Sequence, residues 1–342
     1  MSLGGVVGAV MLGVGAACSG PAGPLVLVDP CWENPSSAAP PAELRCTGLY
    51  DDWAARRVAG NVHAFSPGTA LWSDGAQKQR WLYLPPGQPI DASDPDEWVF
   101  PVGTKAWKEF SVGGRRVETR LYAKVSGDRW QRATYVWSPD QTAASRADDG
   151  IRNWEGTGYE IPPVTDCDKC HAGRRDRLLG VEAIGLGEAS ATGLPLELLV
   201  RQGRIVPALD AAAAQLPLAM PPAQRAALSW LHVNCGVSCH NRAADARAMG
   251  TRLFLRLELG QVTAARQGAG ALDPIVTTVA VATRAARWPG LRITAGSPAQ
   301  SQLFRLASSR GPDQMPPLLS HLPDPEGTRI LREWIESLGP PR

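Results

Sequence analysis

Hydrophobic and polar positions follow two different periods along the chain, and the period changes near residue 163. Between residues 50 and 162, short runs of alternating, aromatic or β-branched residues are separated by turn sequences, and this pattern predicts antiparallel strands. Gly113-Gly114 lies between two such runs and is typical of a hairpin turn. The runs cover residues 80–84, 98–100, 104–112, 117–125 and 134–137.

From residue 163 onward the apolar residues recur at helical spacing, in segments rich in Ala and Leu. The predicted helices cover residues 192–201, 221–233, 297–308 and 324–338. Residues 253–257 and 275–282 have a more β-like composition and predict an insertion that contains strands. Together the two halves predict an α+β fold, with a β-rich, sandwich-like N-terminal domain and a mostly helical remainder.

The first 18 residues resemble an export signal. Leu3 to Ala17 is apolar and ends at Cys18, but it is shorter than the roughly 20 residues that a membrane-spanning helix needs. This arrangement predicts a signal segment at residues 1–18, with Cys18 as the lipidated residue of a bacterial lipobox. A plain secretory signal is the alternative. Residues 19–49 are rich in Pro, Ser and Ala and predict a tether.

The composition is that of an ordinary folded protein with two or three domains. The chain has 342 residues, of which 44% are hydrophobic, and a formal net charge of +2. Because this charge is close to zero and no basic patch or phosphate-binding loop is present, the sequence argues against a nucleic-acid partner or an anionic membrane surface.

Cys167-Asp168-Lys169-Cys170-His171 is a Cys-x-x-Cys-His sequence, the motif for covalent attachment of a c-type haem. The two thiols of such a motif bond to the haem vinyl groups, and the histidine is the proximal ligand of the iron. A thioredoxin-like pair or half of a zinc site would not require a histidine directly after the second cysteine. Cys167, Cys170 and His171 are therefore predicted to hold a first haem.

Cys235-Gly236-Val237-Ser238-Cys239-His240 has the same order of side chains, with one additional residue between the cysteines. On a helix, positions i and i+4 still share a face, so both thiols can reach one edge of a porphyrin. Cys235, Cys239 and His240 are therefore predicted to hold a second covalent haem. A disulfide or a single thioether bond is the alternative.

A loose repeat supplies the candidates for the distal iron ligands. His171 and His240 are each followed by a Met-Pro-Pro sequence and then by a helix that contains tryptophan. Methionine opposite a proximal histidine suits electron transfer. Met315 is therefore predicted to ligate the second haem, and Met220 the first. The alternatives for the first haem are an open position or one of three histidines: His63, His232 and His321.

Cys31 and Cys46 remain once the other five cysteines are assigned. In an oxidising compartment such a pair is predicted to form a disulfide, with two free thiols as the alternative. Closing a loop of about 15 residues in this way would contribute about 3 kcal/mol.

The expected divisions of the chain are a signal, a tether, a β-rich domain, a first haem unit and a second haem unit with the β-like insertion. Their boundaries are 1–18, 19–49, 50–162, 163–233 and 234–342. The β-rich part contains eight of the 12 Trp residues, which predicts a Trp-filled core, with an aromatic binding face as the alternative. Its charged residues are expected to form a solvated face or surface ion pairs. They include Asp74, Lys78, Arg80, Glu118 and Arg120.

From about residue 60 onward, the chain resembles a family of uncharacterised bacterial dihaem c-type cytochromes, often lipoproteins, with haem domains similar to class I cytochromes c. The segments that carry the resemblance are 71–78, 100–104, 118–121, 135–137, 167–171, 231–241, 315–317 and 334–335. The chain departs from the family between Cys235 and Cys239, where the family has two intervening residues. The resemblance implies haem binding and electron transfer, without a settled substrate.

These observations together favour an exported electron carrier with two covalently attached haem c groups. Its partners would be other redox proteins, and a lipid anchor would be its contact with a membrane. The expected location is the periplasm or outer membrane of a Gram-negative bacterium. A dihaem peroxidase-like enzyme with an open first haem, or a haem-based sensor, is the alternative.

Overall fold

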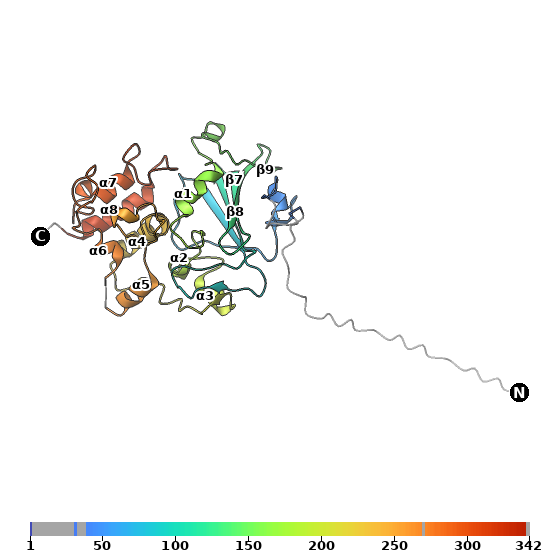
Figure 1. The fold of residues 1–342 in the computed structure, drawn as a ribbon, viewed down its shortest axis with the longest axis horizontal. Coiled ribbons are helices and arrows are strands. Elements are labelled where there is room, and N and C mark those ends of the chain that lie inside the picture. Colours follow the sequence, from blue (N-terminus) through green and yellow to red (C-terminus); the bar gives the residue numbers. More distant parts are fainter. Residues whose placement is uncertain (2–30, 33–38, 269–270, 340–342) are drawn as a thin grey trace.

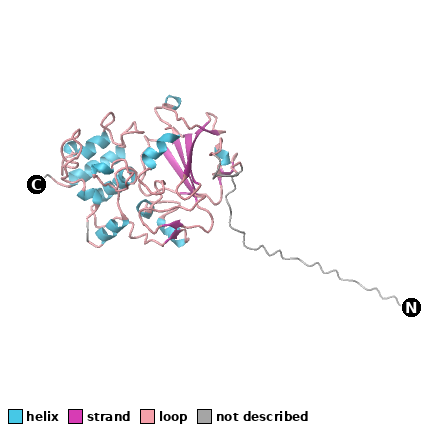
Figure 2. Ribbon diagram, viewed as in Figure 1, coloured by secondary structure: helices cyan, strands magenta, loops and turns pink. Residues whose placement is uncertain are grey.

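The computed structural model describes residues 1, 31–32, 39–268 and 271–339, and it has an α+β fold (Figure 1). Strands gather on one side of the molecule and most helices on the other (Figure 2). Cys18, the candidate for lipidation, lies outside the described residues. Within the described residues, no helix is long and apolar enough to span a bilayer.

The main sheet has six antiparallel strands in the spatial order β3-β4-β6-β7-β8-β9. Two further sheets have two strands each, β1-β2 and β5-β10. The strands are β1 (Tyr50–Asp52), β2 (Arg57–Val58), β3 (His63–Ala64), β4 (Gln77–Tyr83), β5 (Ile90–Asp91), β6 (Lys105–Val112), β7 (Arg115–Lys124), β8 (Trp130–Trp137), β9 (Ala144–Arg146) and β10 (Ile205–Val206).

The predicted hairpin between β6 and β7 is confirmed. Gly113 and Gly114 have φ angles of 57° and 79°, and a tight hairpin turn of this type requires positive φ at both central residues. The prediction of a strand at residues 98–100 is wrong, because this segment makes only an isolated bridge between Val99 and Asp91. The sandwich-like prediction also fails for the described residues, since no second large sheet packs on the first.

Two different sets of residues cover the faces of the main sheet. On one face, Trp81, Trp107 and Trp137 form a core with Leu44 and other residues of the N-terminal segment. This segment is joined to itself by a disulfide between Cys31 and Cys46, whose Cα atoms are 4.9 Å apart. The alternation of side chains along each strand therefore gives the sheet two buried faces.

The opposite face of the sheet packs against the helical half of the chain. Leu82 and Tyr122 of the sheet belong to the same core as Leu228 and Trp334 of the helices. The core therefore runs across the boundary that the sequence suggested near residue 163. The helices are α1 (Cys167–His171), α2 (Ala183–Gly187), α3 (Leu196–Arg201), α4 (Pro222–Leu231), α5 (Leu259–Arg266), α6 (Asp273–Val276), α7 (Gln302–Ser308) and α8 (Pro325–Ser337).

Helices α4 and α8 begin within one residue of their predicted starts, whereas α3 and α7 begin four and five residues later than predicted. Asp324 accepts hydrogen bonds from Glu326 and Gly327 and caps α8, and its other oxygen accepts one from Trp230 of α4 at 2.8 Å. The predicted β-like insertion is wrong, because residues 253–257 form no strand and Ile275 lies in α6.

Candidate functional site

Both Cys-His motifs line one cavity of about 290 Å³ between the main sheet, α1, the end of α4 and the loop before α8. The cysteines and histidines at its wall are Cys167, Cys170, His171, Cys235, Cys239 and His240. The second motif begins at Cys235, 64 residues after the first motif ends at His171. The fold therefore brings together the two strongest chemical signals of the sequence.

The first motif forms α1, which lies against the sheet beside β7 (Figure 1). The His171 ring stacks on Tyr122, with centroids 4.4 Å apart and an angle of 19° between the planes. Its Nδ1 lies 2.6 Å from the carbonyl oxygen of Arg177. This contact fixes the ring and leaves Nε2 available for a ligand.

The second motif uses a wider turn. Residues 232–236 form a π-helical turn that continues α4, and such turns are often found at functional sites. The backbone N–H of His240 donates to the carbonyl of Cys235 at 2.9 Å, an i to i+5 bond. Because the α-helical bond of the first motif spans four residues, the π-type bond takes up the one additional residue. Cys235 and His240 consequently remain one turn apart.

The two motifs touch each other directly. The Ser238 hydroxyl, between Cys235 and Cys239, donates to the backbone carbonyl of Cys170. Gly173 has a φ of 79°, and a Cβ atom there would lie 2.5 Å from the Ser238 carbonyl oxygen. Only glycine fits this close approach without strain.

Burial keeps the thiols of Cys170 and Cys235 and the two cavity imidazoles uncharged. It raises the pKa of Cys170, and it raises that of Cys235 to about 12, with Cys239 adding to the effect. Burial also lowers the pKa of His171 to about 3 and that of His240 to about 4. Thiols of this kind do not suit thioredoxin-like exchange, which requires a thiolate. Neutral imidazole is the form that binds a metal.

A buried ion pair fastens the loop after the first motif to the sheet. Lys124 of β7 and Asp176 have side chains that are 1% and 4% exposed, and their charged atoms are 2.6 Å apart. Asp176 also accepts hydrogen bonds from the Trp130 indole at 2.7 Å and the Phe100 backbone at 2.5 Å. Asp176 thus joins three segments of the β-rich half to the chain that follows His171.

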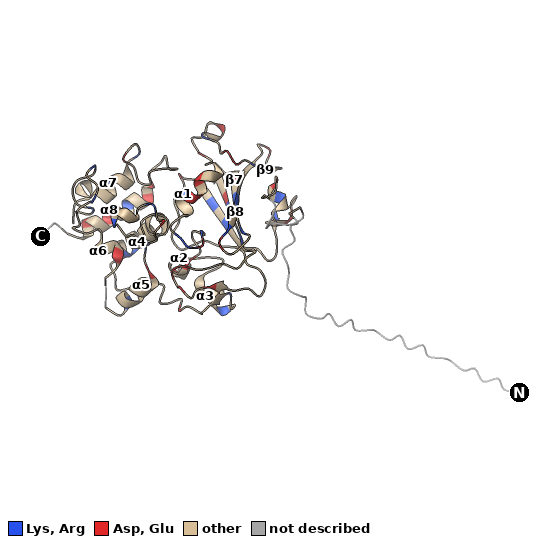
Figure 3. Ribbon diagram, viewed as in Figure 1, with Lys and Arg blue, Asp and Glu red and all other residues tan. Residues whose placement is uncertain are grey.

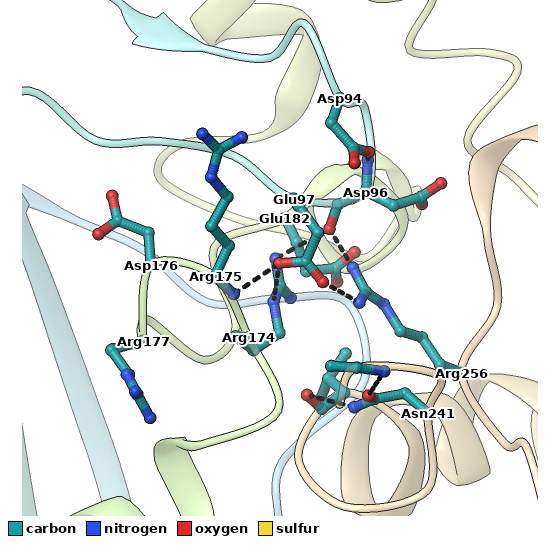
Figure 4. A network of polar contacts seen from close by, with 12 residues as sticks. Asp94, Asp96, Glu97, Arg174, Arg175, Asp176, Arg177, Glu182, Asn241 and Arg256 are labelled. Atoms are coloured by element: carbon teal, nitrogen blue, oxygen red, sulfur yellow. Dashed lines mark hydrogen bonds and ion pairs between the residues drawn. The ribbon is translucent and has the colours of Figure 1, made fainter. Parts of the chain in front are cut away.

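A second polar network ties both motifs to the loop before β6 (Figure 4). Glu97 accepts from Arg256, which follows the second motif, and lies 3.6 Å from the guanidinium of Arg174, which follows the first. Both arginines also donate to the backbone carbonyl of Asp96. Burial raises the pKa of Asp96 to about 6, although Leu259 donates a hydrogen bond to its carboxylate.

His232, an alternative ligand for the first haem, is a structural residue in this fold. It is fully buried, does not line the cavity, and accepts a hydrogen bond from the Leu257 backbone at 2.9 Å through Nδ1. Its Nε2 is 3.3 Å from Glu182. Burial acts to raise the pKa of Glu182, but His232, Arg174 and the Gly185 backbone outweigh it and lower the pKa to about 2.

The two predicted methionine ligands occupy different positions. Met315 lines the cavity, in the loop before α8. Met220 packs against the large core and is not part of the cavity wall. It precedes α4, whereas Cys235 follows that helix, and at 1.5 Å per residue the helical run between them is roughly 20 Å long. The Met-Pro-Pro repeat of the sequence is therefore not repeated in space.

The other two histidines also lie away from the cavity wall. His63 belongs to β3, at the edge of the main sheet. His321 is exposed and pairs with Glu160 at 2.6 Å. Of the five histidines in the chain, His171 and His240 are the two that line the cavity.

The expectation that the charged residues of the β-rich part form a solvated face is wrong for most of them. Lys78, Arg80 and Arg120 line the cavity, and Glu118 is fully buried. Lys108 joins them from β6, and Figure 3 shows Lys and Arg in blue on strands of the main sheet. Their positions on alternate residues of β4, β6 and β7 are the sequence signal that could have placed them on one face of the sheet.

The donor set at the cavity fits two covalently attached haem groups. It offers two pairs of thiols, a neutral imidazole beside each pair, and the thioether of Met315. No group of three or more His, Cys, Asp or Glu side chains in the described ranges is arranged to hold a bare metal ion. Comparison with protein-family models, with curated proteins and with solved structures finds no match to this chain.

Proposed function

We propose that the protein is an exported dihaem c-type cytochrome that transfers electrons. Cys167, Cys170 and His171 would hold one haem, and Cys235, Cys239 and His240 the other. The helical half would then consist of two cytochrome c-like units, and the N-terminal residues would direct export and carry a lipid anchor at Cys18 in the periplasm or outer membrane.

The observation that carries the proposal is the shared cavity. Two Cys-His motifs far apart in sequence line the same wall, and Ser238 of one donates to Cys170 of the other. This contact would keep the two haem groups close together within one rigid unit. Closeness of this kind favours passage of electrons within a single chain.

The residues of the chain would position the cofactors rather than react. The Arg177 carbonyl and the Tyr122 ring hold the His171 imidazole in one orientation. Burial keeps both imidazoles neutral and able to ligate iron. Haem iron supplies the one-electron chemistry, and a Met315 thioether opposite a histidine would raise the potential.

A haem count tests the proposal. The protein is expressed with a cytochrome c maturation system, and pyridine haemochrome absorbance is compared with protein mass. We expect two haems in the wild-type chain, and one in each double variant, Cys167→Ser/Cys170→Ser and Cys235→Ser/Cys239→Ser. Cys31→Ser/Cys46→Ser is the matched control and should retain two. A wild-type chain without covalent haem would refute the proposal.

The position of Met220 favours a second candidate, a peroxidase-like oxidoreductase. Within the described residues, Met315 is the one methionine at the cavity wall, so the first haem would keep an exchangeable sixth position. Reaction of one high-spin haem with hydrogen peroxide would support the enzyme. Two low-spin haems that do not react with peroxide would support the carrier.

A further inference from the structure

Three cations form a continuous row across the main sheet on the face toward the cavity. The strand register pairs Arg80 of β4 with Lys108 of β6, and Lys108 with Arg120 of β7. Neighbouring strands are about 4.8 Å apart, so the three residues are direct cross-strand neighbours. Lys78 lies one position further along the same face of β4. Like charges in this arrangement repel one another, and all four residues line the cavity.

In this row Arg80 is buried, Lys108 and Arg120 are half-buried, and the pairing of the charges is incomplete. Arg80 is 6% exposed, and its Nε and Nη2 atoms have no hydrogen-bond partner. Arg120 pairs with Glu118, whereas Lys108 contacts the Phe110 ring, with its Nζ 5.8 Å from the ring centroid. Burial together with Arg80 and Arg120 lowers the pKa of Lys108 to about 7, and burial lowers that of Arg80 to about 10. An unpaired buried charge is strongly unfavourable.

The acidic residues at the cavity wall are engaged elsewhere. Asp74 accepts from the backbone of His321 at 2.6 Å, and Glu160 pairs with the His321 ring. Asp166 pairs with Lys169 at 2.6 Å, and Asp324 caps α8. None of these contacts involves the row. Glu118 offsets the charge of Arg120, so the positive charges of Arg80 and Lys108 are left for a group that enters the cavity.

We propose that Arg80, Lys108 and Arg120 form a receptor for a carboxylate inside the cavity. The guanidinium groups match a carboxylate because two N–H groups can donate to its two oxygens. One source is the pair of propionate side chains that each haem carries, and this source rests on the proposed function. The other source is a small soluble carboxylate that enters the same space.

The test compares wild-type protein with Arg80→Gln, which removes the charge that has the fewest partners. Resonance Raman spectra of the holoprotein report hydrogen bonding to the haem propionates. Thermal unfolding in sodium formate, against sodium chloride at equal ionic strength, reports binding of a soluble carboxylate. Arg116→Gln is the matched control, because Arg116 pairs with Glu109 on the opposite face of the same sheet. Lys108→Met replaces Arg80→Gln if the latter does not fold.

Each result identifies the source or overturns the proposal. Propionate bands that shift in Arg80→Gln but not in Arg116→Gln identify the cofactor as the source. Stabilisation by formate that weakens tenfold or more in Arg80→Gln identifies a soluble carboxylate. Unchanged bands together with no effect of formate would overturn the receptor. If the haem count is zero, the proposed function fails while the formate measurement alone decides the receptor.

Discussion

The two Cys-His motifs share the same order of chemical groups but are built on different backbones. The first lies on the short α-helix α1. The second begins inside the π-helical turn of residues 232–236, and the i to i+5 hydrogen bond from His240 to Cys235 takes up one more residue. A difference in spacing along the sequence is thus offset by a difference in the width of a turn. The comparison teaches that motif spacing has to be interpreted together with the local winding of the chain.

The anchoring of the two motifs also differs. The segment after the first motif is held to the sheet by the buried Lys124–Asp176 pair. The segment after the second is held by Arg242 and Asp273, 2.8 Å apart, with the arginine side chain 53% exposed. Water screens the second pair much more than the first. Both motifs share the Glu97 network with the β-rich half, and they differ in the burial of these additional ion pairs.

The largest expected effect separates these two anchors. Asp176→Asn leaves Lys124 buried without a charged partner, and such a loss costs about 3–5 kcal/mol of unfolding free energy. Asp273→Asn, the matched variant at the second motif, should cost below about 1 kcal/mol because its partner is solvated. Urea unfolding at neutral pH measures both. Equal losses would show that the two motifs are anchored alike.

An effect of intermediate size concerns the pH dependence of folding stability near the second motif. Glu182, beside His232, has a folded pKa of about 2, below the ordinary glutamate value of about 4.3. The ionised carboxylate therefore stabilises the folded state above about pH 5, and this contribution is lost as the pH falls toward 2.

Glu182→Gln checks this assignment in urea titrations at several pH values. The stability difference between wild type and variant should be largest near pH 6 and shrink steadily below pH 4. The same difference at every pH would mean that the carboxylate charge does not contribute. Glu326→Gln is the control, because Glu326 is an exposed partner of Arg329 on α8.

The smallest expected effect on stability accompanies the clearest spectral change. Met315 is partly buried, so Met315→Ala should reduce the unfolding free energy by less than a fully buried methionine would. In the proposed dihaem protein, the haem bound by His240 should nevertheless become high-spin and its potential should fall. Absorption spectra and redox titration measure both properties. Met220→Ala should leave them unchanged, and a spectral change in Met220→Ala would contradict the placement of Met220 outside the cavity wall.

Local patterns predicted much of the secondary structure and failed where contacts between distant segments decide. The β6–β7 hairpin, α4 and α8 follow from Gly113-Gly114, Pro222 and Asp324, because each of these residues acts on its own neighbours. Residues 253–257 are apolar enough for a strand, but no partner strand lies beside them. Apolar composition alone cannot supply the hydrogen-bond partners that a strand requires.

The sequence by itself determined the groups on which the proposed chemistry depends, since the identity and order of Cys167, Cys170 and His171 require no knowledge of the fold. Only the tertiary structure decided that the second motif shares the same cavity, that Met315 lies at its wall and Met220 does not, and that a row of cations faces it from the sheet. The physical reason is the distance along the chain over which each feature is determined. A motif is a local arrangement of a few residues, whereas a cavity is formed by packing between segments whose distance along the chain carries no information about their contact.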